Sequence, residues 1–222
     1  SIFLCFAFFL SGNVSAQDNR VQADSLMQII GASKSDASKK EAIVNYLRHV
    51  SMLLPDEGIT YIEKALENQV YKTDSLFVAK RYKYYGISLV VNESYNKAVN
   101  VHRRSISYVQ KIRNPEALAL LRDIYANEAV LYGEMGFRYT QLQKMTEILP
   151  LNRELKDEMA TYNMYYNFGL AYYALSEYNK ALENLYLARN YISDASVKYF
   201  ERGFTEILMG GVYVRLNKPD SV

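Results

Sequence analysis

The sequence repeats one pattern of large and small apolar residues about every 41 positions, and this period constrains the fold most. In the clearest copy, residues 162–195, apolar side chains recur three and four positions apart up to Tyr172 and again from Tyr178. The polar pair Ser176-Glu177 separates the two stretches. Spacing of three and four is the period of one helix face, and no stretch after Asp18 alternates like a strand. The copy therefore predicts two helices joined by a tight turn.

Five copies of this pattern follow one another in phase. Their small or anchoring residues are Tyr46, Gly86, Ala129, Gly169 and Gly210, which lie 40, 43, 40 and 41 residues apart. One pair of helices cannot bury its apolar face alone, so successive pairs are expected to stack. We expect repeat units near residues 39–78, 79–121, 122–161, 162–202 and 203–222, the last of them truncated.

The clearest copy resembles the consensus of the tetratricopeptide repeat (TPR). Residues 165–172, Tyr-Tyr-Asn-Phe-Gly-Leu-Ala-Tyr, match large-x-x-Leu-Gly-x-x-Tyr, and Ala181, Leu185 and Ala188 match Ala-x-x-x-Phe-x-x-Ala. The resemblance implies an all-α fold, a right-handed superhelical α-solenoid of helix-turn-helix units. Because the shortest TPR has about 34 residues, each unit here carries roughly seven more.

The N-terminus has the pattern of a signal peptide. Residues 2–10 are an unbroken apolar run, which is too short to span a bilayer. Val14-Ser15-Ala16 then offers the small residues that signal peptidase accepts, so we expect residues 1–16 to be removed. Cys5 is the only cysteine, and its loss would leave a mature chain without disulfides. The chain is therefore expected to be exported, as a periplasmic protein or the periplasm-facing part of an inner-membrane protein.

Residues 17–38 are expected to form a helix and loop that cap the first repeat. Asp24 or Ser25 can cap a short helix whose apolar side would be Leu26, Ile29 and Ile30.

Two local signals predict breaks within the repeats. Asp56-Glu57-Gly58 reads as the turn of the first unit. Pro150 should end or kink its helix near Leu149, with residues 151–159 forming an extension.

No residue grouping predicts chemistry. The two histidines, His49 and His102, lie in different repeats, and His102 occupies a position where the repeat needs a packing residue. The mature chain would lack cysteine, which disfavours structural zinc. We expect no catalytic residue, no metal, no cofactor and no enzymatic activity. Net charge is +2, and we interpret Arg103-Arg104 as part of a solvated helix face, so nucleic acid is not an expected partner.

The resemblance implies a binding face, because the first helix of each TPR unit lines the concave side of the stack. In the first and third units the corresponding positions include Ile43, Leu47, Val50, Ala126 and Gly133. The residues expected to contact a partner are Lys83, Ile87, Val90, Val130, Tyr166, Leu170 and Tyr173. Burial between repeats would explain many of these positions equally well. The set is mainly apolar and lacks the basic residues of TPR carboxylate clamps, which favours an apolar helix or an extended protein segment as partner.

Three functions are compatible with these features. The first is an exported TPR scaffold that binds a protein or peptide through its concave surface. The second follows from the order of signal peptide, short helix and 40-residue units, which resembles the extracytoplasmic sensor region of bacterial TPR-containing histidine kinases and helix-turn-helix regulators. A transmembrane segment and an output domain would then follow Val222. The third is an enzyme whose catalytic domain lies beyond Val222.

Overall fold

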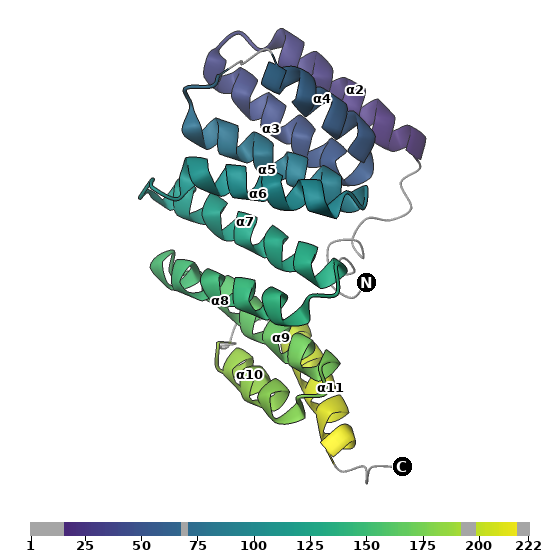
Figure 1. Ribbon diagram of the computed structural model, residues 1–222, viewed down its shortest axis with the longest axis vertical. Helices are drawn as coiled ribbons and strands as arrows, with labels where there is room; N and C mark the ends of the chain where they lie inside the picture. The colour runs from purple at the N-terminus through teal and green to yellow at the C-terminus, as the bar shows by residue number, and fades with distance from the viewer. Residues whose placement is uncertain (1–15, 68–70, 192–198, 217–222) are drawn as a thin grey trace. The chain divides into compact units, whose positions relative to one another are not determined.

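The described residues of the computed structural model, 16–67, 71–191 and 199–216, contain ten α-helices and no strand (Figure 1). The expectation of an all-α fold is therefore confirmed. Residues 1–15, including Cys5 and nearly all of the expected signal peptide, lie outside the described residues. The helices are α2 (Ala16–Ala32), α3 (Asp36–Leu53), α4 (Pro55–Glu67), α5 (Ser75–Val91), α6 (Tyr95–Val109), α7 (Pro115–Glu134), α8 (Arg138–Glu154), α9 (Glu158–Ala174), α10 (Tyr178–Asn190) and α11 (Tyr199–Leu216).

The chain divides into two compact units between Met135 and Gly136. The first unit holds α2 to α7 and the second holds α8 to α11. The third expected repeat, residues 122–161, spans this division.

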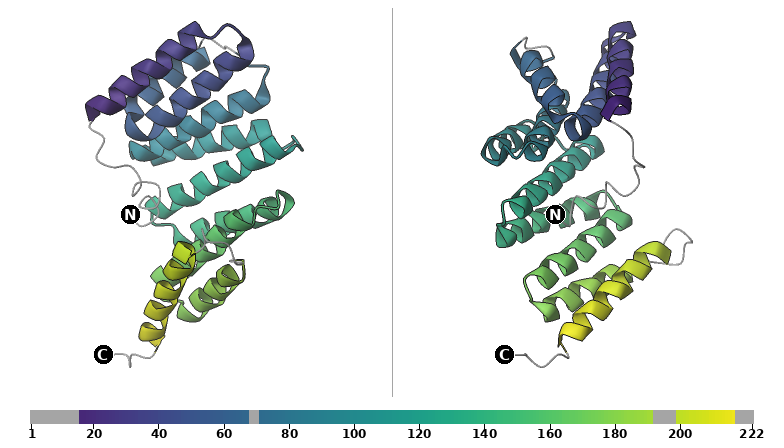
Figure 2. Two further views of the ribbon diagram at one scale, coloured as in Figure 1. Left: turned by 180° about the vertical axis from the view of Figure 1, so that it is seen from behind. Right: turned by 90° about the vertical axis from the view of Figure 1, so that its right-hand side faces the viewer.

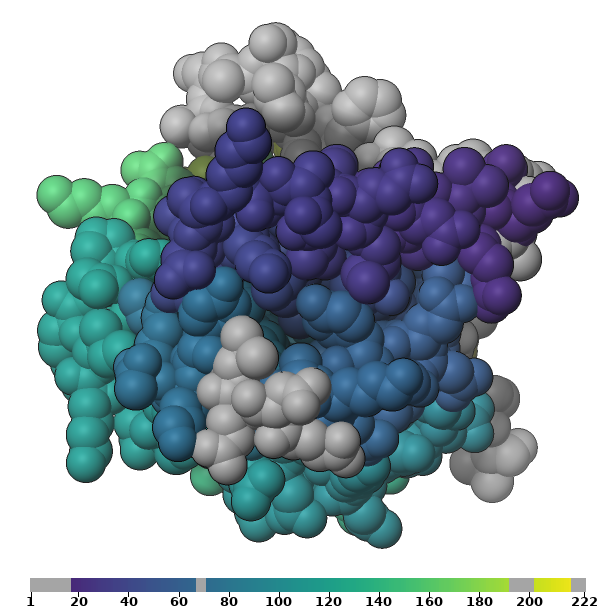
Figure 3. All heavy atoms as spheres, turned by 90° about the horizontal axis from the view of Figure 1, so that it is seen from above, coloured from purple at the N-terminus to yellow at the C-terminus, as the bar shows by residue number. Residues whose placement is uncertain are grey.

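Helices of the first unit stack in a repeating order. Within each pair, α3 packs on α4 and α5 packs on α6. The first helices also pack on one another, α3 on α5 and α5 on α7, so they lie side by side (Figure 2). Helix α2 packs on α3 and forms a purple band along this unit in the space-filling view (Figure 3). In the second unit α9 likewise packs on α10 and on α11, which gives both units a helical-repeat-like architecture.

The first helix of each pair begins with a side-chain cap. Ser35 accepts a hydrogen bond from the backbone N–H of Ser38, and Asp74 accepts one from Phe77. The same bond forms at Asn114 before α7 and at Asp157 before α9. Such caps satisfy amide groups that have no partner within the helix, which explains why these four helices begin where they do.

Helices α6, α8 and α10 begin without a side-chain cap bond and follow a tight turn instead. Each follows a residue with left-handed backbone: Glu93 (φ 56°), Gly136 (φ 80°) and Ser176 (φ 60°). At the first of these turns, the Ser94 N–H donates to the Leu89 carbonyl oxygen at 2.7 Å. This closes the preceding helix in the manner of a Schellman motif. The repeat therefore fixes the turn as well as the helices.

The expected turn at Asp56-Glu57-Gly58 is wrong, because these residues form the first turn of α4. Only Leu54 connects α3 to α4. Proline is favoured at the first position of a helix and acidic residues in its first turn, so Pro55 was the signal to follow. Gly58 is buried at a close approach, where an added Cβ would lie 2.7 Å from Ser88 Oγ of α5.

The helix end expected at Pro150 is also wrong, since α8 continues through it to Glu154. Proline removes one backbone hydrogen bond, whose acceptor would be the Thr146 carbonyl. Thr146 is exposed, so water can replace the missing donor there. Leu151 and Asn152 are buried and hold the last turn in place. Residues 151–159 therefore complete α8, pass through a turn and begin α9.

Helix α2 is longer than expected, and Asp24 and Ser25 lie in its interior rather than at its start. The Ser25 hydroxyl donates to the Val21 carbonyl oxygen at 3.0 Å, an ordinary bond for a serine inside a helix. Its buried residues are Ala23 and Ile30, whereas Ile29, which was expected on the apolar side, is 53% exposed. The helix nevertheless packs on α3, as expected for a cap of the first repeat.

Small residues allow the paired helices to cross closely. Gly86 of α5 faces His102 of α6, and an added Cβ would lie 2.0 Å from the ring Nε2. His102 is fully buried, as its interpretation as a packing residue requires. Burial lowers the pKa of His102 to about 4, so its imidazole is neutral near pH 7. In the second unit, Gly169 has the same relation to Leu185, at 2.6 Å.

Candidate functional site

The seven residues expected to contact a partner are all half-buried, and they lie on first helices in both units. Lys83, Ile87, Val90 and Val130 lie in the first unit, on α5 and α7, whereas Tyr166, Leu170 and Tyr173 lie in the second, on α9. We call these two sets the α5–α7 face and the α9 face.

The α5–α7 face is part core and part surface. Ile87 and Val90 pack against the main hydrophobic cluster of the first unit, yet neither is fully buried. Lys83 was expected to be the main charge of the groove, but its Nζ lies 3.2 Å from Asp123 Oδ2, and its side chain is only 13% exposed. The lysine charge is therefore compensated within the protein, and apolar side chains dominate this face.

The matching positions of the first repeat do not form a surface. Ile43 is buried, and Leu47 and Val50 are 0% exposed, all within the cluster that also contains Ala23 and Ile30 of α2. The expectation of a binding surface on α3 is therefore wrong at these positions, because α2 packs on α3. The sequence predicts this helix only as a cover for the open end of the first repeat.

The α9 face is aromatic. Tyr166 and Tyr173 pack against the second unit's cluster of Ala181, Leu185, Met209 and Val212. The ring of Tyr166 stacks on Tyr162 with centroids 6.1 Å apart. Burial raises the pKa of Tyr166. Leu170 lies between the two tyrosines, one helical turn from each, so the face presents a continuous apolar stripe along α9.

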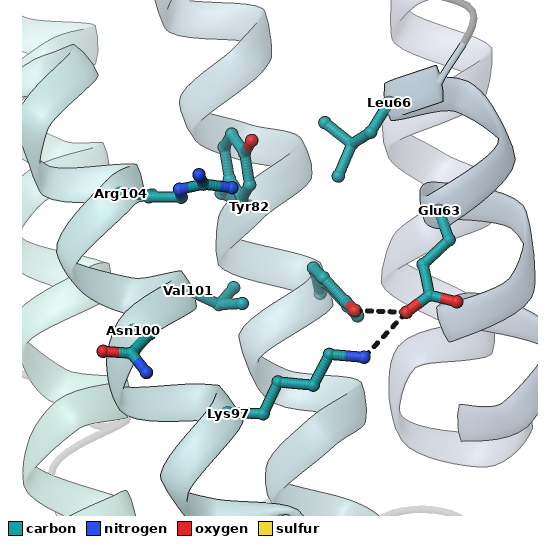
Figure 4. A pocket seen from close by; sticks show the side chains of 8 residues that line it. Glu63, Leu66, Tyr82, Lys97, Asn100, Val101 and Arg104 are labelled. Atoms are coloured by element: carbon teal, nitrogen blue, oxygen red, sulfur yellow. Dashed lines mark hydrogen bonds and ion pairs between the residues drawn. The ribbon is translucent and has the colours of Figure 1, made fainter.

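A groove that the sequence did not predict lies over α5, between α4 and α6 (Figure 4). It encloses about 400 Å³. Its lining residues come from three helices: Glu63 and Leu66 of α4, Tyr82 and Tyr85 of α5, and Lys97, Asn100, Val101 and Arg104 of α6. Both α4 and α6 pack on α5, which forms the floor.

One end of the groove is closed by a charge pair. Lys97 Nζ donates to Glu63 Oε1 at 2.8 Å, and the Tyr85 hydroxyl donates to the same oxygen (Figure 4). The hydrogen bonds from Lys97 and then from Tyr85 lower the pKa of Glu63. The bond to Glu63 also raises the pKa of Lys97 to about 12. Both groups are therefore ionised near neutral pH and compensate each other.

The other end of the groove carries an arginine over an aromatic ring. The guanidinium carbon of Arg104 lies 6.0 Å from the centroid of the Tyr82 ring, which in turn stacks on Tyr108 at 5.8 Å. Leu66 lies across from Arg104, near the end of α4 (Figure 4). Among the residues whose side chains the structure describes, which leaves out Glu67, Arg104 has no ion-pair partner. Arg104 is exposed, as the interpretation of a solvated face predicts, but that interpretation does not predict the ring beneath it.

The described ranges contain neither a metal-binding cluster nor a membrane-spanning helix. No three His, Cys, Asp or Glu side chains converge there on a common point where a metal ion could bind. Every helix in those ranges is too short or too polar to span a bilayer.

No protein-family model matches the sequence, and no curated protein sequence is significantly similar to it. Nine chains among the solved structures do match. One is the crystal structure of BtubC (BKLC) from P. vanneervenii, with a TM-score of 0.51 and 18% sequence identity. The match covers 73% of this chain and 64% of BtubC, so the chain spans less than two thirds of that protein. At this identity the similarity concerns the fold alone, an all-α helical architecture.

Proposed function

We propose that the chain is a TPR-type helical repeat that binds a protein or peptide partner and catalyses no reaction. The TPR-like consensus around Gly169 and the in-phase helix pairs support this assignment. So does the packing order, in which α3, α5 and α9 each contact their own second helix and the next first helix. The apolar run and Ala16 motif support an exported module.

The observation that carries the proposal is that first helices in each of the two units have half-buried apolar residues. Ile87 and Val90 on α5 retain surface although they pack against a core, and Leu170 on α9 is half-buried between two tyrosines that do the same. An amphipathic helix or an extended segment with apolar side chains would complete the burial of these residues. The compensated charge of Lys83 means that affinity would come from apolar area, with little dependence on salt.

In the first step of the experiment, peptides that bind the 222-residue chain are selected from a displayed random library. The dissociation constant of the best peptide is then measured by calorimetry for the wild type and four variants. Leu170→Ala and Ile87→Ala remove side chains of the proposed faces. Leu187→Ala on α10 and Ile106→Ala on α6 remove the same side chains from second helices.

We expect Leu170→Ala or Ile87→Ala to raise the dissociation constant about tenfold, the effect of losing one apolar anchor. The two second-helix variants should bind like the wild type. Equal affinity of all five proteins, or an equal loss in the second-helix variants, would contradict the proposal. Circular dichroism melts of each variant control for loss of fold.

A further inference from the structure

We propose that the groove between α4 and α6 is a second binding site, which takes an extended peptide segment in which a carboxylate adjoins an apolar side chain. The groove lies between α4 and α6 over α5, whereas the α5–α7 face follows the first helices. It is therefore a site separate from the one that carries the proposed function.

The size of the groove favours an extended segment over a helix. Its volume of about 400 Å³ falls in the range of clefts that accept small ligands. A helix with side chains is about 10–12 Å across, so a single turn would already fill this space. An extended chain directs alternate side chains to one side and can place one or two of them in the groove. Arg104, Asn100 and Lys97 are exposed, which leaves the groove accessible from solvent.

The charges of the groove favour one carboxylate at a defined end. Lys97 and Arg104 lie seven residues apart on α6, about 10 Å along its axis. Lys97 is compensated by Glu63, whereas Arg104 lies over the Tyr82 ring and pairs with no carboxylate among the described side chains. A guanidinium can bind a carboxylate through two parallel hydrogen bonds while its plane remains on an aromatic ring. The Arg104 end is therefore where an acidic side chain would bind.

The same end also offers an apolar contact. Leu66 of α4 and Val101 of α6 line the groove beside Tyr82, and Val101 lies one turn from Arg104 (Figure 4). An apolar side chain next to the bound carboxylate would bury against these three residues. The Glu63–Lys97 pair at the other end is neutral overall, so Arg104 offers the ligand a single positive charge, which matches one carboxylate better than phosphate groups or nucleic acid.

The test is a titration of the ¹⁵N-labelled 222-residue chain, followed by NMR. The probe peptide is acetyl-Gly-Leu-Glu-Leu-Gly-amide, and its counterpart has Gln in place of Glu. The signals observed are the side-chain Nε–H of Arg104 and the side-chain amide of Asn100. Arg104→Gln is compared with Arg103→Gln, which removes the neighbouring exposed charge on α6 outside the groove lining.

We expect the Glu peptide to shift both signals and to bind about tenfold more tightly than the Gln peptide, because a charge-assisted bond is lost in the latter. Arg104→Gln should remove this preference, whereas Arg103→Gln should keep it. The assignment is overturned if neither signal shifts at millimolar peptide, if both peptides bind equally, or if Arg103→Gln has the same effect as Arg104→Gln. If free 3-phenylpropionate binds as tightly as the Glu peptide, the ligand is not a peptide. If inorganic phosphate binds more tightly than the Glu peptide, the groove does not select a carboxylate.

Failure here is distinguishable from failure of the proposed function. Ile87→Ala should leave this titration unchanged, and Arg104→Gln should leave affinity for the library-selected peptide unchanged.

Discussion

Replacing Gly86 with alanine tests the close crossing of α5 and α6. The added Cβ would lie 2.0 Å from His102 Nε2 and 2.1 Å from His102 Cδ2. Carbon atoms that are not bonded to each other do not approach much closer than about 3.5 Å. The imidazole would therefore have to move by more than an ångström. It is 0% exposed, so it cannot move into solvent without separating the two helices.

Two opposing effects set the magnitude of the change in stability. Overpacking a well-packed core costs about 1–3 kcal/mol, and the upper end applies because the ring is fully enclosed. Alanine gains about 1 kcal/mol over glycine inside a helix. We therefore expect Gly86→Ala to lower the free energy of unfolding by about 2 kcal/mol.

The assay is urea unfolding followed by far-ultraviolet circular dichroism. Gly31→Ala is the matched control, because Gly31 lies in a helix of the same unit and an added Cβ there meets no heavy atom within 4 Å. That variant should be neutral or gain up to about 1 kcal/mol. In a His102→Ala background the obstacle is absent, so Gly86→Ala should then cost nothing. Wild-type stability of Gly86→Ala, or the same loss in both backgrounds, would refute the reasoning.

Three further predictions concern the same stability measurement. The pKa of histidine is about 6.5 in an unfolded chain, whereas the pKa of His102 in the folded chain is about 4. As the pH falls from 7 to 5, the unfolded chain therefore binds a proton at this residue and the folded chain does not. The free energy of unfolding should drop by about 2 kcal/mol more in wild type than in His102→Leu between pH 7 and 5, and parallel pH profiles would speak against a neutral buried imidazole. Asn114→Ala removes a side-chain cap and should cost about 1 kcal/mol, whereas Ser94→Ala, at a start without a cap bond, should cost almost nothing. Residues 93 and 136 both have left-handed backbone, which favours glycine. Glu93→Gly should therefore raise the free energy of unfolding by up to about 1 kcal/mol, and Gly136→Ala should lower it by a similar amount. A change of the same sign in both variants would exclude this cause.

Periodicity was sufficient to predict the helix pairs, since it reports the buried face of each helix. The sequence predicts a turn at Ser176 between two helices, and in the structure α9 ends at Ala174 and α10 begins at Tyr178. The ends of helices were harder to predict where two signals competed. Gly58 suggested a turn, but the tertiary contact with α5 explains that glycine, and Pro55 marks the helix start.

The binding surfaces were less predictable because they depend on how helices from different repeats meet. Leu47 occupies a position on α3 equivalent to Ile87 on α5, yet only Ile87 retains surface, because α2 packs on α3. The groove forms because Glu63 of α4 and Arg104 of α6, which belong to neighbouring helix pairs, line the same cleft. The spacing of residues within one helix does not predict how far apart two residues on different helices lie. Arg104 therefore looked like any exposed arginine in the sequence.

The claim that the first helices bind the partner is tested most directly by photo-crosslinking. The photoreactive residue p-benzoyl-phenylalanine is placed at Leu170 or Ile87, and in separate proteins at Leu187 or Ile106, and each is irradiated with the library-selected peptide. Mass spectrometry then measures the covalent adduct. We predict adducts at Leu170 or Ile87 and none at the two second-helix positions. Adducts that form only at Leu187 or Ile106 would contradict the claim.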